Sequence, residues 1–153
     1  MVIRTATEAD LEQIRQLFLE LDTCSIKQQP EHFQRGERSD AYLASLMEND
    51  DSDFLVGIKD NTIVGFSLVF FRETKPISLL VPCAYGFVQD FVVSEKYRRQ
   101  GYGTQLLEAS RRWAKDRGAQ YLRLSVIPNN EAGIRFYRKN GLYPQMITME
   151  CPI

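Results

Sequence analysis

Cysteine, histidine and long apolar runs are scarce in this chain, and each shortage excludes a class of protein. The three cysteines, Cys24, Cys83 and Cys151, lie far apart and form no CxxC pair, so we read them as reduced thiols of a cytoplasmic protein. No apolar run approaches the roughly 20 residues that cross a bilayer, and the N-terminal residues lack the apolar region of a secretory signal. We expect neither a membrane span nor a metal site.

The chain also has little net charge, but its charge is unevenly distributed. A net charge of −1 argues against a non-specific nucleic-acid binder. Residues 1–60 contain 13 acidic and 6 basic residues, whereas residues 61–153 contain 13 basic and 7 acidic residues. An anionic ligand would suit the second part and a cationic ligand the first, although most single charges belong to solvated faces. The length of 153 residues predicts one domain, residues 1–153.

Hydrophobic spacing and turn residues predict a mixed α/β sheet flanked by helices, in the order β-α-α-β-β-β-α-β-α-β. Strands are expected at Val2–Ala6, Phe54–Ile58, Thr62–Phe71, Tyr85–Val93, Tyr121–Val126 and residues 142–150. Helices are expected from Thr7 to about Leu21, and at Ser39–Glu48, Gly101–Arg117 and Asn130–Lys139. The KDNT turn predicts a hairpin, and the polar stretch 22–38 is expected to be irregular.

Residues 97–107, YRRQGYGTQLL, combine glycine and positive charge at the mouth of a predicted helix. A helix N-terminus has unpaired N–H groups and partial positive charge, so it is a natural anion site. Gly101 and Gly103 allow the backbone to approach a bulky anion closely. No Lys-Ser or Lys-Thr follows the second glycine, and Leu106 replaces the third glycine of the dinucleotide fingerprint. The two common nucleotide motifs are therefore absent.

RRQGYG at residues 98–103 resembles the R/Q-x-x-G-x-G/A signature of the GNAT superfamily of N-acetyltransferases. The preceding FVVSEKYR, residues 91–98, is similar to the strand and turn that lead into that signature. Residues 130–141, NEAGIRFYRKNG, resemble the second motif, N-x-x-A-x-x-x-Y-x-x-x-G, with Gly133 where alanine is usual. The element order agrees over nearly the whole chain, and the resemblance implies the splayed mixed sheet of that family.

The resemblance further implies acetyl-CoA as cosubstrate. Main-chain N–H groups of residues 99–104 would hold the diphosphate, and the pantetheine arm would pair with the strand, chiefly at Phe91 and Val93. Asn130 would contact the cofactor, and Tyr137 would lie near the sulfur. The implied cofactor residues are Phe91, Val92, Val93, Arg98, Arg99, Gln100, Gly101, Tyr102, Gly103, Thr104, Asn130 and Tyr137.

Acetyl transfer to an amine needs a base, an oxyanion donor and a group that serves the departing sulfur. The resemblance implies that Tyr137 meets the sulfur and that a strand N–H, such as that of Phe91, meets the oxyanion. Asp90 lies inside an apolar strand beside the predicted reaction centre, where it is either the base or a carboxylate that caps a turn. Family members often have glutamate at the positions occupied here by Phe87 and Gln89, so the base is not assigned by the resemblance. Glu73 and Glu31 are less favoured candidates for that base. His32 either lines the acceptor pocket or lies on the surface.

The acidic first part of the chain favours a cationic acceptor, and some stretches resemble the diamine and polyamine branch of the family. We expect a small primary amine or polyamine, with a peptide or protein amine as the alternative. A non-catalytic acyl-CoA sensor is the alternative from another class, because Phe87 and Gln89 replace the usual glutamates. A homodimer is common among relatives, and the sequence does not decide the oligomeric state.

Overall fold

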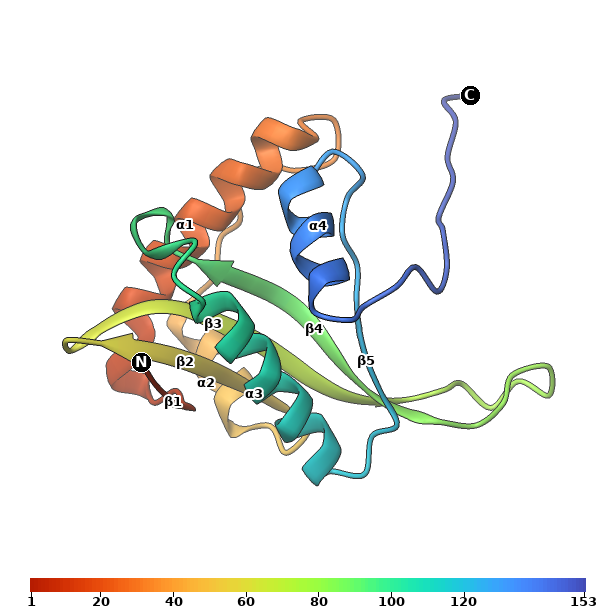
Figure 1. The fold of residues 1–153 in the computed structure, drawn as a ribbon, viewed down its shortest axis with the longest axis horizontal. Helices are drawn as coiled ribbons and strands as arrows, with labels where there is room; N and C mark the ends of the chain where they lie inside the picture. The colour runs from red at the N-terminus through yellow and green to blue at the C-terminus, as the bar shows by residue number, and fades with distance from the viewer.

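Five strands form one sheet in chain order, β1-β2-β3-β4-β5, as Figure 1 shows for the computed structural model of residues 1–153. The first four strands are antiparallel to their neighbours, and β5 is parallel to β4. The strands are β1 (Val2–Thr5), β2 (Ser52–Lys59), β3 (Thr62–Glu73), β4 (Ala84–Val93) and β5 (Tyr121–Leu124). The helices are α1 (Leu11–Gln28), α2 (Asp40–Glu48), α3 (Tyr102–Asp116) and α4 (Glu131–Lys139), with short 3-10 turns η1 (Glu8–Asp10) and η2 (Glu95–Tyr97).

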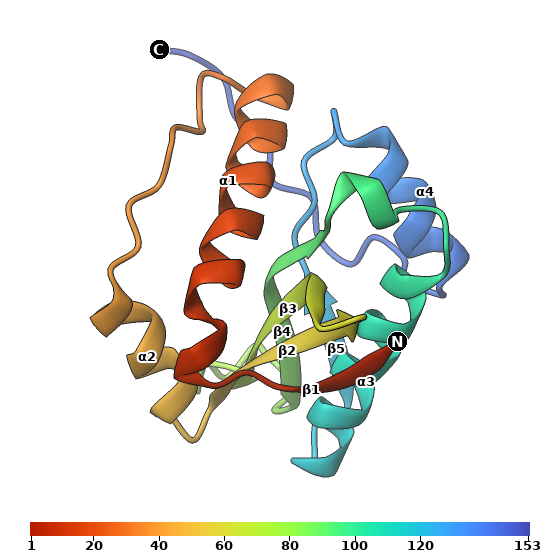
Figure 2. The same ribbon diagram turned by 90° about the vertical axis from the view of Figure 1, so that its left-hand side faces the viewer.

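The face of the sheet that carries α1 and α2 holds the larger core (Figure 2). Phe18 of α1 packs on Phe54 and Phe66 of the central strands, with ring centroids 6.2 and 4.8 Å away. Each such buried side chain contributes roughly 1.5–3 kcal/mol by leaving water. This apolar contact explains why the two N-terminal helices lie on the same face.

The opposite face of the sheet is covered by α3 (Figure 2). Leu106 and Leu107 are fully buried there, and the Trp113 indole N–H donates a hydrogen bond of 2.6 Å to the Asp53 carboxylate. Ser110 donates to the Ser67 hydroxyl at 2.8 Å across the same interface. By contrast, α4 contributes no fully buried residue.

The predicted mixed α/β architecture is confirmed, including the hairpin between β2 and β3. Asp60 and Asn61 form its two-residue turn with φ values of 48° and 62°, as the twist of a tight hairpin requires. The predicted start of the third helix is also within one residue of the observed Tyr102. Local sequence signals are sufficient to predict these elements, because turn residues and apolar spacing indicate the same structure at each place.

The prediction that the first helix ends near Leu21 is wrong, because α1 continues to Gln28. The extra turns are polar in sequence but gain a tertiary contact that apolar spacing cannot reveal. Asp22 is buried and accepts two hydrogen bonds of 2.9 Å from the Arg38 guanidinium. This ion pair holds the segment that connects α1 to α2 against the added turns.

The predicted final strand over residues 142–150 is also absent. A strand requires a partner for its N–H and C=O groups, and no residue after Leu142 makes a main-chain hydrogen bond within the chain. Figure 1 shows this segment leaving the end of α4 and running apart from the sheet.

None of the helices is both long enough and apolar enough to cross a membrane.

Candidate active site

One edge of β4 is open along its second half. β5 pairs with Tyr85–Val88 only, whereas β3 continues alongside β4 as far as Val93. Figure 1 shows the two parallel strands diverging beyond that point. Apart from the Val93 carbonyl, which accepts a hydrogen bond from Arg98, the edge of β4 over residues 89–93 therefore offers main-chain N–H and C=O groups to an extended ligand.

A bulge at Gln89 sets the direction of the side chains on this open half. Leu68 pairs with Asp90 and Val69 with Val88, which leaves Gln89 without a partner on β3. Side chains alternate after the bulge, so Val92 joins the core with α1 and Asp90 lies on the same face. Phe91 lies on the other face, stacked on Phe136 of α4 at 5.9 Å between ring centroids.

The turn between β4 and α3 carries a set of unpaired N–H groups. Arg99 and Gly101 have left-handed backbones with φ of 60° and 83°, and no side chain caps the helix. None of the six main-chain N–H groups from Arg99 to Thr104 donates a hydrogen bond within the chain. Helix N-termini with free N–H groups bind anions, so this turn is suited to a phosphate group.

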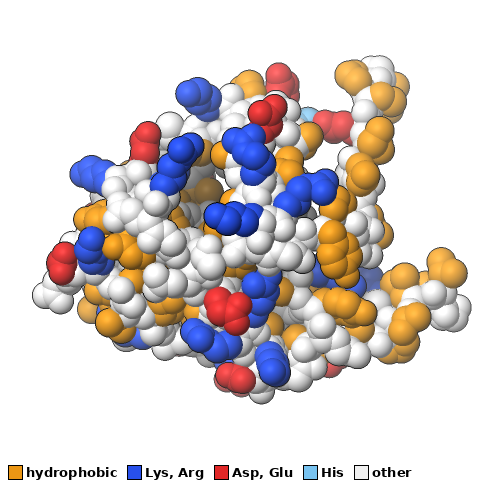
Figure 3. Space-filling view, in the orientation of Figure 1, with side chains coloured by type: hydrophobic (Ala, Val, Ile, Leu, Met, Phe, Trp, Pro, Cys, Tyr) orange, Lys and Arg blue, Asp and Glu red, His pale blue; other side chains and the backbone are white.

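Basic side chains surround this part of the surface. Figure 3 shows Lys and Arg side chains around a recess that lies between η2 and α4. The exposed bases that these elements and the following turn supply are Lys96, Arg98, Arg99, Arg135, Arg138 and Lys139. Their charge adds to that of the helix terminus and favours an anionic ligand.

A side chain of α1 and one of the turn itself hold the turn in place. Glu20 of α1 accepts hydrogen bonds from the Ser94 hydroxyl at 2.9 Å and the Glu95 N–H at 3.1 Å. Arg98 donates from Nε to the Val93 carbonyl at 2.9 Å, so its side chain is turned back to the end of β4. The Tyr102 ring is buried, which leaves its main-chain N–H as the group available to a ligand. Glu20 was missed from the sequence, since nothing in its local pattern points to residue 94.

Tyr137 lies beside the open edge of β4 in an aromatic cluster with Phe91 and Phe136. Its ring centroid is 6.2 Å from that of Phe91 and 5.2 Å from that of Phe136. Burial raises the pKa of the Tyr137 hydroxyl to about 12. The hydroxyl makes no hydrogen bond within the chain and remains a protonated donor at neutral pH.

Gly103 lies where the turn packs against this aromatic cluster. A Cβ built at Gly103 would lie 3.1 Å from Cζ of Phe136, so glycine lets α4 pack closely on the start of α3. A larger residue at position 103 would therefore displace the cluster as well as the turn. A Gly103→Val substitution would thus change both features at once.

Asn130 has a structural role that the motif did not indicate. Its side-chain oxygen accepts a hydrogen bond of 3.0 Å from the Gly133 N–H and caps α4. A Cβ at position 133 would lie 2.4 Å from Nδ2 of Asn130. Glycine at position 133, where the motif usually has alanine, thus allows this conformation of Asn130.

The Asp90 carboxyl lies near the Asp22–Arg38 ion pair and accepts no hydrogen bond itself. Burial raises its pKa, the Arg38 guanidinium opposes the shift, and the Asp22 carboxylate adds to it. Because Asp90 accepts nothing from a backbone N–H, it does not cap a turn. Capping a turn is therefore excluded as the alternative to a role as base. Arg38 and Asp22 were not predicted here, since their pairing spans a stretch that was expected to be irregular.

Of the remaining acid and base candidates, Glu73 lies far from this region, whereas Glu31 and His32 are exposed in the turn after α1. Glu73 ends β3 opposite Ala84, five strand positions from the Leu68–Asp90 pair, or roughly 17 Å along the sheet. Glu31 is exposed in the turn after α1. The imidazole of His32 contacts the Glu150 carboxylate and is half exposed, which confirms the surface reading of this histidine.

Comparison with known structures agrees with this architecture. A mutant of the BH1408 protein from Bacillus halodurans superposes with a TM-score of 0.93 at 24% identity, over 100% of both chains. The aminoglycoside N-acetyltransferase AAC(6′)-Iy, in complex with CoA, gives a TM-score of 0.78 at 17% identity, over 99% of this chain and 98% of that chain. At these identities the likeness concerns the fold alone.

Sequence comparison is more specific. An N-alpha-acetyltransferase of Saccharolobus solfataricus is 37% identical over 91 residues, 56% of this chain and 53% of that protein. The uncharacterized N-acetyltransferase MJ1207 of Methanocaldococcus jannaschii is 25% identical over 139 residues, 91% of this chain and 59% of that protein. The chain spans between 24% and 62% of the length of the curated relatives it matches. The family described as Acetyltransferase (GNAT) matches residues 11–142, most of the sequence, and the chain therefore belongs to the GNAT acetyltransferases.

Proposed function

We propose that the chain transfers an acetyl group from acetyl-CoA to the nitrogen of a primary amine, by direct transfer in a ternary complex. The observation that carries this proposal is the run of free N–H groups from Arg99 to Thr104, next to an open edge of β4. A diphosphate would accept hydrogen bonds from these N–H groups, and the two amides of pantetheine would pair with the β4 edge. Coenzyme A carries both groups in one molecule.

The relatives support this assignment. The relatives that the chain matches include proteins named N-acetyltransferase and N-alpha-acetyltransferase, and AAC(6′)-Iy shares the fold and holds CoA. All three cysteines of this chain are free thiols, which suits the cytoplasmic location that we propose with the activity.

The two catalytic candidates suit the two ends of the transfer. The amine nitrogen attacks the acetyl carbonyl carbon, the carbon–sulfur bond breaks, and the sulfur leaves as thiolate or thiol. We assign Asp90, on the α1 face of β4, as the base that accepts the amine proton. Tyr137, on the α4 face, would donate a hydrogen bond to the departing sulfur. The attacking nitrogen and the leaving sulfur are bonded to the same carbon in the tetrahedral intermediate, so the transfer would take place at the open edge of β4, approached by Asp90 from one face and by Tyr137 from the other.

A pKa of about 12 limits what Tyr137 does. Transfer of its proton to a thiolate of pKa ~8.5 would be uphill by about 5 kcal/mol. We therefore assign Tyr137 a donated hydrogen bond to the leaving sulfur, rather than complete proton transfer before the carbon–sulfur bond breaks.

Our first candidate acceptor is a small cationic amine or polyamine, because of the acidic first part of the chain. A peptide α-amine is the second candidate, favoured by the relatives named N-alpha-acetyltransferase. The two differ chemically: an α-amine has a pKa of about 8 and an alkylamine about 10.4, so the alkylamine depends more strongly on a base.

The test is thiol release from acetyl-CoA with a panel of diamines, polyamines and short peptides with free N-termini. We expect turnover with an amine of one class and no thiol release without an acceptor. Binding of acetyl-CoA without turnover on any amine would favour the acyl-CoA sensor. Absence of both binding and turnover would contradict the proposal.

A glycine pair at the two ends of α3 tests the diphosphate site. Gly101 and Gly118 have φ of 83° and 85°, and a Cβ at either position meets no atom within 4 Å. Alanine at either site strains the backbone by a similar amount, about 1–2 kcal/mol. We expect Gly101→Ala to weaken acetyl-CoA binding about tenfold or more, by turning N–H groups away from the diphosphate. Gly118→Ala is the matched control, and calorimetry that finds equal affinities for the two variants would contradict the site.

A further inference from the structure

Two carboxylates lie near one guanidinium on the α1 face of β4. Asp22 of α1 and Asp90 of β4 are both close to Arg38, which belongs to the segment that connects α1 to α2. With both carboxylates ionised, this cluster of two acids and one base has a net negative charge. A carboxylate that is partly buried without a cation is costly, so it matters which of the two acids Arg38 pairs with.

Arg38 is paired with Asp22. Each carboxylate oxygen of Asp22 accepts a hydrogen bond of 2.9 Å from a terminal nitrogen of the guanidinium, which is the bidentate geometry that fixes orientation. The Gly36 N–H donates a third hydrogen bond of 3.0 Å to Asp22. Burial alone would raise the pKa of Asp22, but these hydrogen bonds lower it, so Asp22 stays ionised at neutral pH.

A ring of the core holds the flat side of the same guanidinium. The central carbon of the Arg38 guanidinium lies 4.0 Å from the centroid of the Phe18 ring. Phe18 in turn packs on Phe66 of β3, the strand next to β4, with ring centroids 4.8 Å apart. The stacking on Phe18 and the pairing with Asp22 together keep the guanidinium at the α1 side of the cluster.

Asp90 is left without a partner of its own. Burial raises its pKa, and Arg38 is close enough to oppose that shift without forming an ion pair with it. The other titratable groups of the surroundings act on the pair: Arg35 acts on Asp22, and Tyr42 acts on Arg38. β3 places an apolar residue opposite Asp90. The half-buried carboxylate of Asp90 is therefore free to accept from a ligand.

We propose that Asp22 is a positioning residue, which holds Arg38 away from Asp90 so that this base stays unpaired for the acceptor amine. The inference rests on the proposed function, in which Asp90 takes the amine proton. While Arg38 pairs with Asp22, the cluster presents one uncompensated negative charge to an incoming ammonium group. The ammonium gives one proton to the Asp90 carboxylate, and the lone pair freed on nitrogen attacks the acetyl carbon. A guanidinium paired with Asp90 would instead occupy its oxygens and repel the ammonium.

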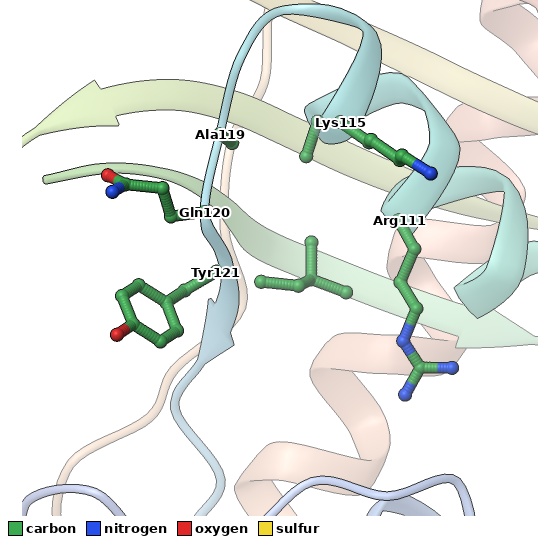
Figure 4. A pocket seen from close by; sticks show the side chains of 7 residues that line it. Arg111, Lys115, Ala119, Gln120 and Tyr121 are labelled. Atoms are coloured by element: carbon green, nitrogen blue, oxygen red, sulfur yellow. The ribbon is translucent and has the colours of Figure 1, made fainter.

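A hollow between β5 and α3 is the competing place for a cationic acceptor (Figure 4). Its volume is about 420 Å³, and the charged residues of its lining are Arg111 and Lys115. Two cations without a carboxylate repel an ammonium group. The hollow also lies beside Tyr121, which pairs with the half of β4 that β5 covers, away from Asp90. The cluster around Asp90 therefore suits an ammonium group, and the hollow does not.

A titration of the side-chain carboxyls in the unmodified chain, followed by carbon-13 NMR, tests the pairing directly. We expect Asp90 to titrate above the usual value of about 3.9 and Asp22 below it. The reverse order would mean that Arg38 pairs with Asp90, and it would overturn the proposal. This readout needs neither acetyl-CoA nor an acceptor, so it remains decisive if the proposed activity fails.

Asp22→Asn releases Arg38 and tests the positioning role. Loss of the Asp22 charge and the approach of Arg38 both lower the pKa of Asp90, so its NMR titration and the acidic limb of the activity should move to lower pH. We expect kcat to fall about tenfold or more, because the base is weaker and paired. The KM of a cationic acceptor should rise about tenfold, because the cluster loses its net negative charge.

The double variant Asp22→Asn, Arg38→Gln removes the guanidinium as well. It should restore most of kcat and of the acceptor KM, and its acidic limb should return to the original pH or above it, because no cation is left to pair with Asp90. A pair that only supports the fold predicts the opposite, since a second loss would add damage. A double variant no more active than Asp22→Asn, or an Asp90 titration that Asp22→Asn leaves in place, would overturn the proposal.

Asp10→Asn is the matched control for loss of a buried ion pair. The side chains of Asp10 and Asp22 are each 8% exposed, and Asp10 likewise accepts two hydrogen bonds from one guanidinium, that of Arg4. Asp10 lies at the start of α1, roughly 18 Å along the helix from Asp22. This variant should leave the acidic limb and the acceptor KM unchanged. Equal shifts in Asp10→Asn and Asp22→Asn would reflect lost stability alone and would contradict the positioning role.

Discussion

Asp90→Asn is expected to lower kcat at least about a hundredfold, the usual scale for loss of a general base. The substitution keeps the size of the side chain and removes its ability to take a proton. Asp90 accepts no hydrogen bond within the chain, so asparagine breaks no hydrogen bond of the folded protein and removes only the attraction to Arg38. The Kd for acetyl-CoA should stay within about twofold, because Asp90 lies on the face of β4 away from the cofactor turn.

The pH dependence of the activity gives a second test of Asp90 as the base. Burial raises the pKa of the Asp90 carboxyl, and only the ionised form accepts the amine proton. Activity of the unmodified protein should therefore fall as the pH drops through that raised pKa. The acidic limb of the pH–rate profile should be missing in Asp90→Asn.

Glu73→Gln is the matched control for Asp90→Asn. It removes one negative charge from the same sheet, at an exposed position opposite Ala84 and far from the open half of β4. Its kcat and pH profile should match those of the unmodified chain. If Asp90→Asn kept full activity and the acidic limb, Asp90 would not be the base.

Tyr137→Phe is expected to lower kcat about tenfold to a hundredfold, the effect of losing one hydrogen bond to a charged or developing charged group. Phenylalanine keeps the ring contacts with Phe91 and Phe136, so α4 should keep its place. The Kd for acetyl-CoA should change little, since the hydroxyl acts on the sulfur only as charge develops there. Single-turnover kinetics and calorimetry separate the two quantities.

Tyr85→Phe is the control for loss of a hydroxyl, because Tyr85 lies on β4 at the end opposite the cofactor turn. The kcat of Tyr85→Phe and its Kd for acetyl-CoA should match those of the unmodified chain. The pKa of about 12 also predicts that Tyr137 causes no fall in kcat on the alkaline side below pH of about 10. An equal loss of kcat and of acetyl-CoA affinity in Tyr137→Phe would mean that the residue only packs.

The sequence was most informative where neighbouring residues decide the structure. The hairpin turn at Asp60 and Asn61, the left-handed Gly101 and the apolar face of α3 all follow from local rules. The same reasoning predicts that Tyr137 lies on a helix, and its position in the motif of residues 130–141 made it a candidate for the active site.

Long-range pairings could not be predicted in this way. The Asp22–Arg38 ion pair extends α1 beyond its apolar pattern, and Glu20 holds a turn more than seventy residues away. The bulge at Gln89 also has no distinct local signal, yet it decides on which face Asp90 lies. The final strand was predicted from an apolar stretch, but a strand requires a neighbour, and residues 143–153 make no main-chain hydrogen bond.

Amide NMR during a titration with CoA tests the central claim most directly. Hydrogen bonds from main-chain N–H groups to a diphosphate should shift the amide proton resonances of Arg99–Thr104 downfield, and these shifts should be the largest in the chain. Pantetheine without the diphosphate should leave those six resonances nearly unchanged. If CoA bound while the amides of the turn did not move, the diphosphate would lie elsewhere and the proposed site would be wrong.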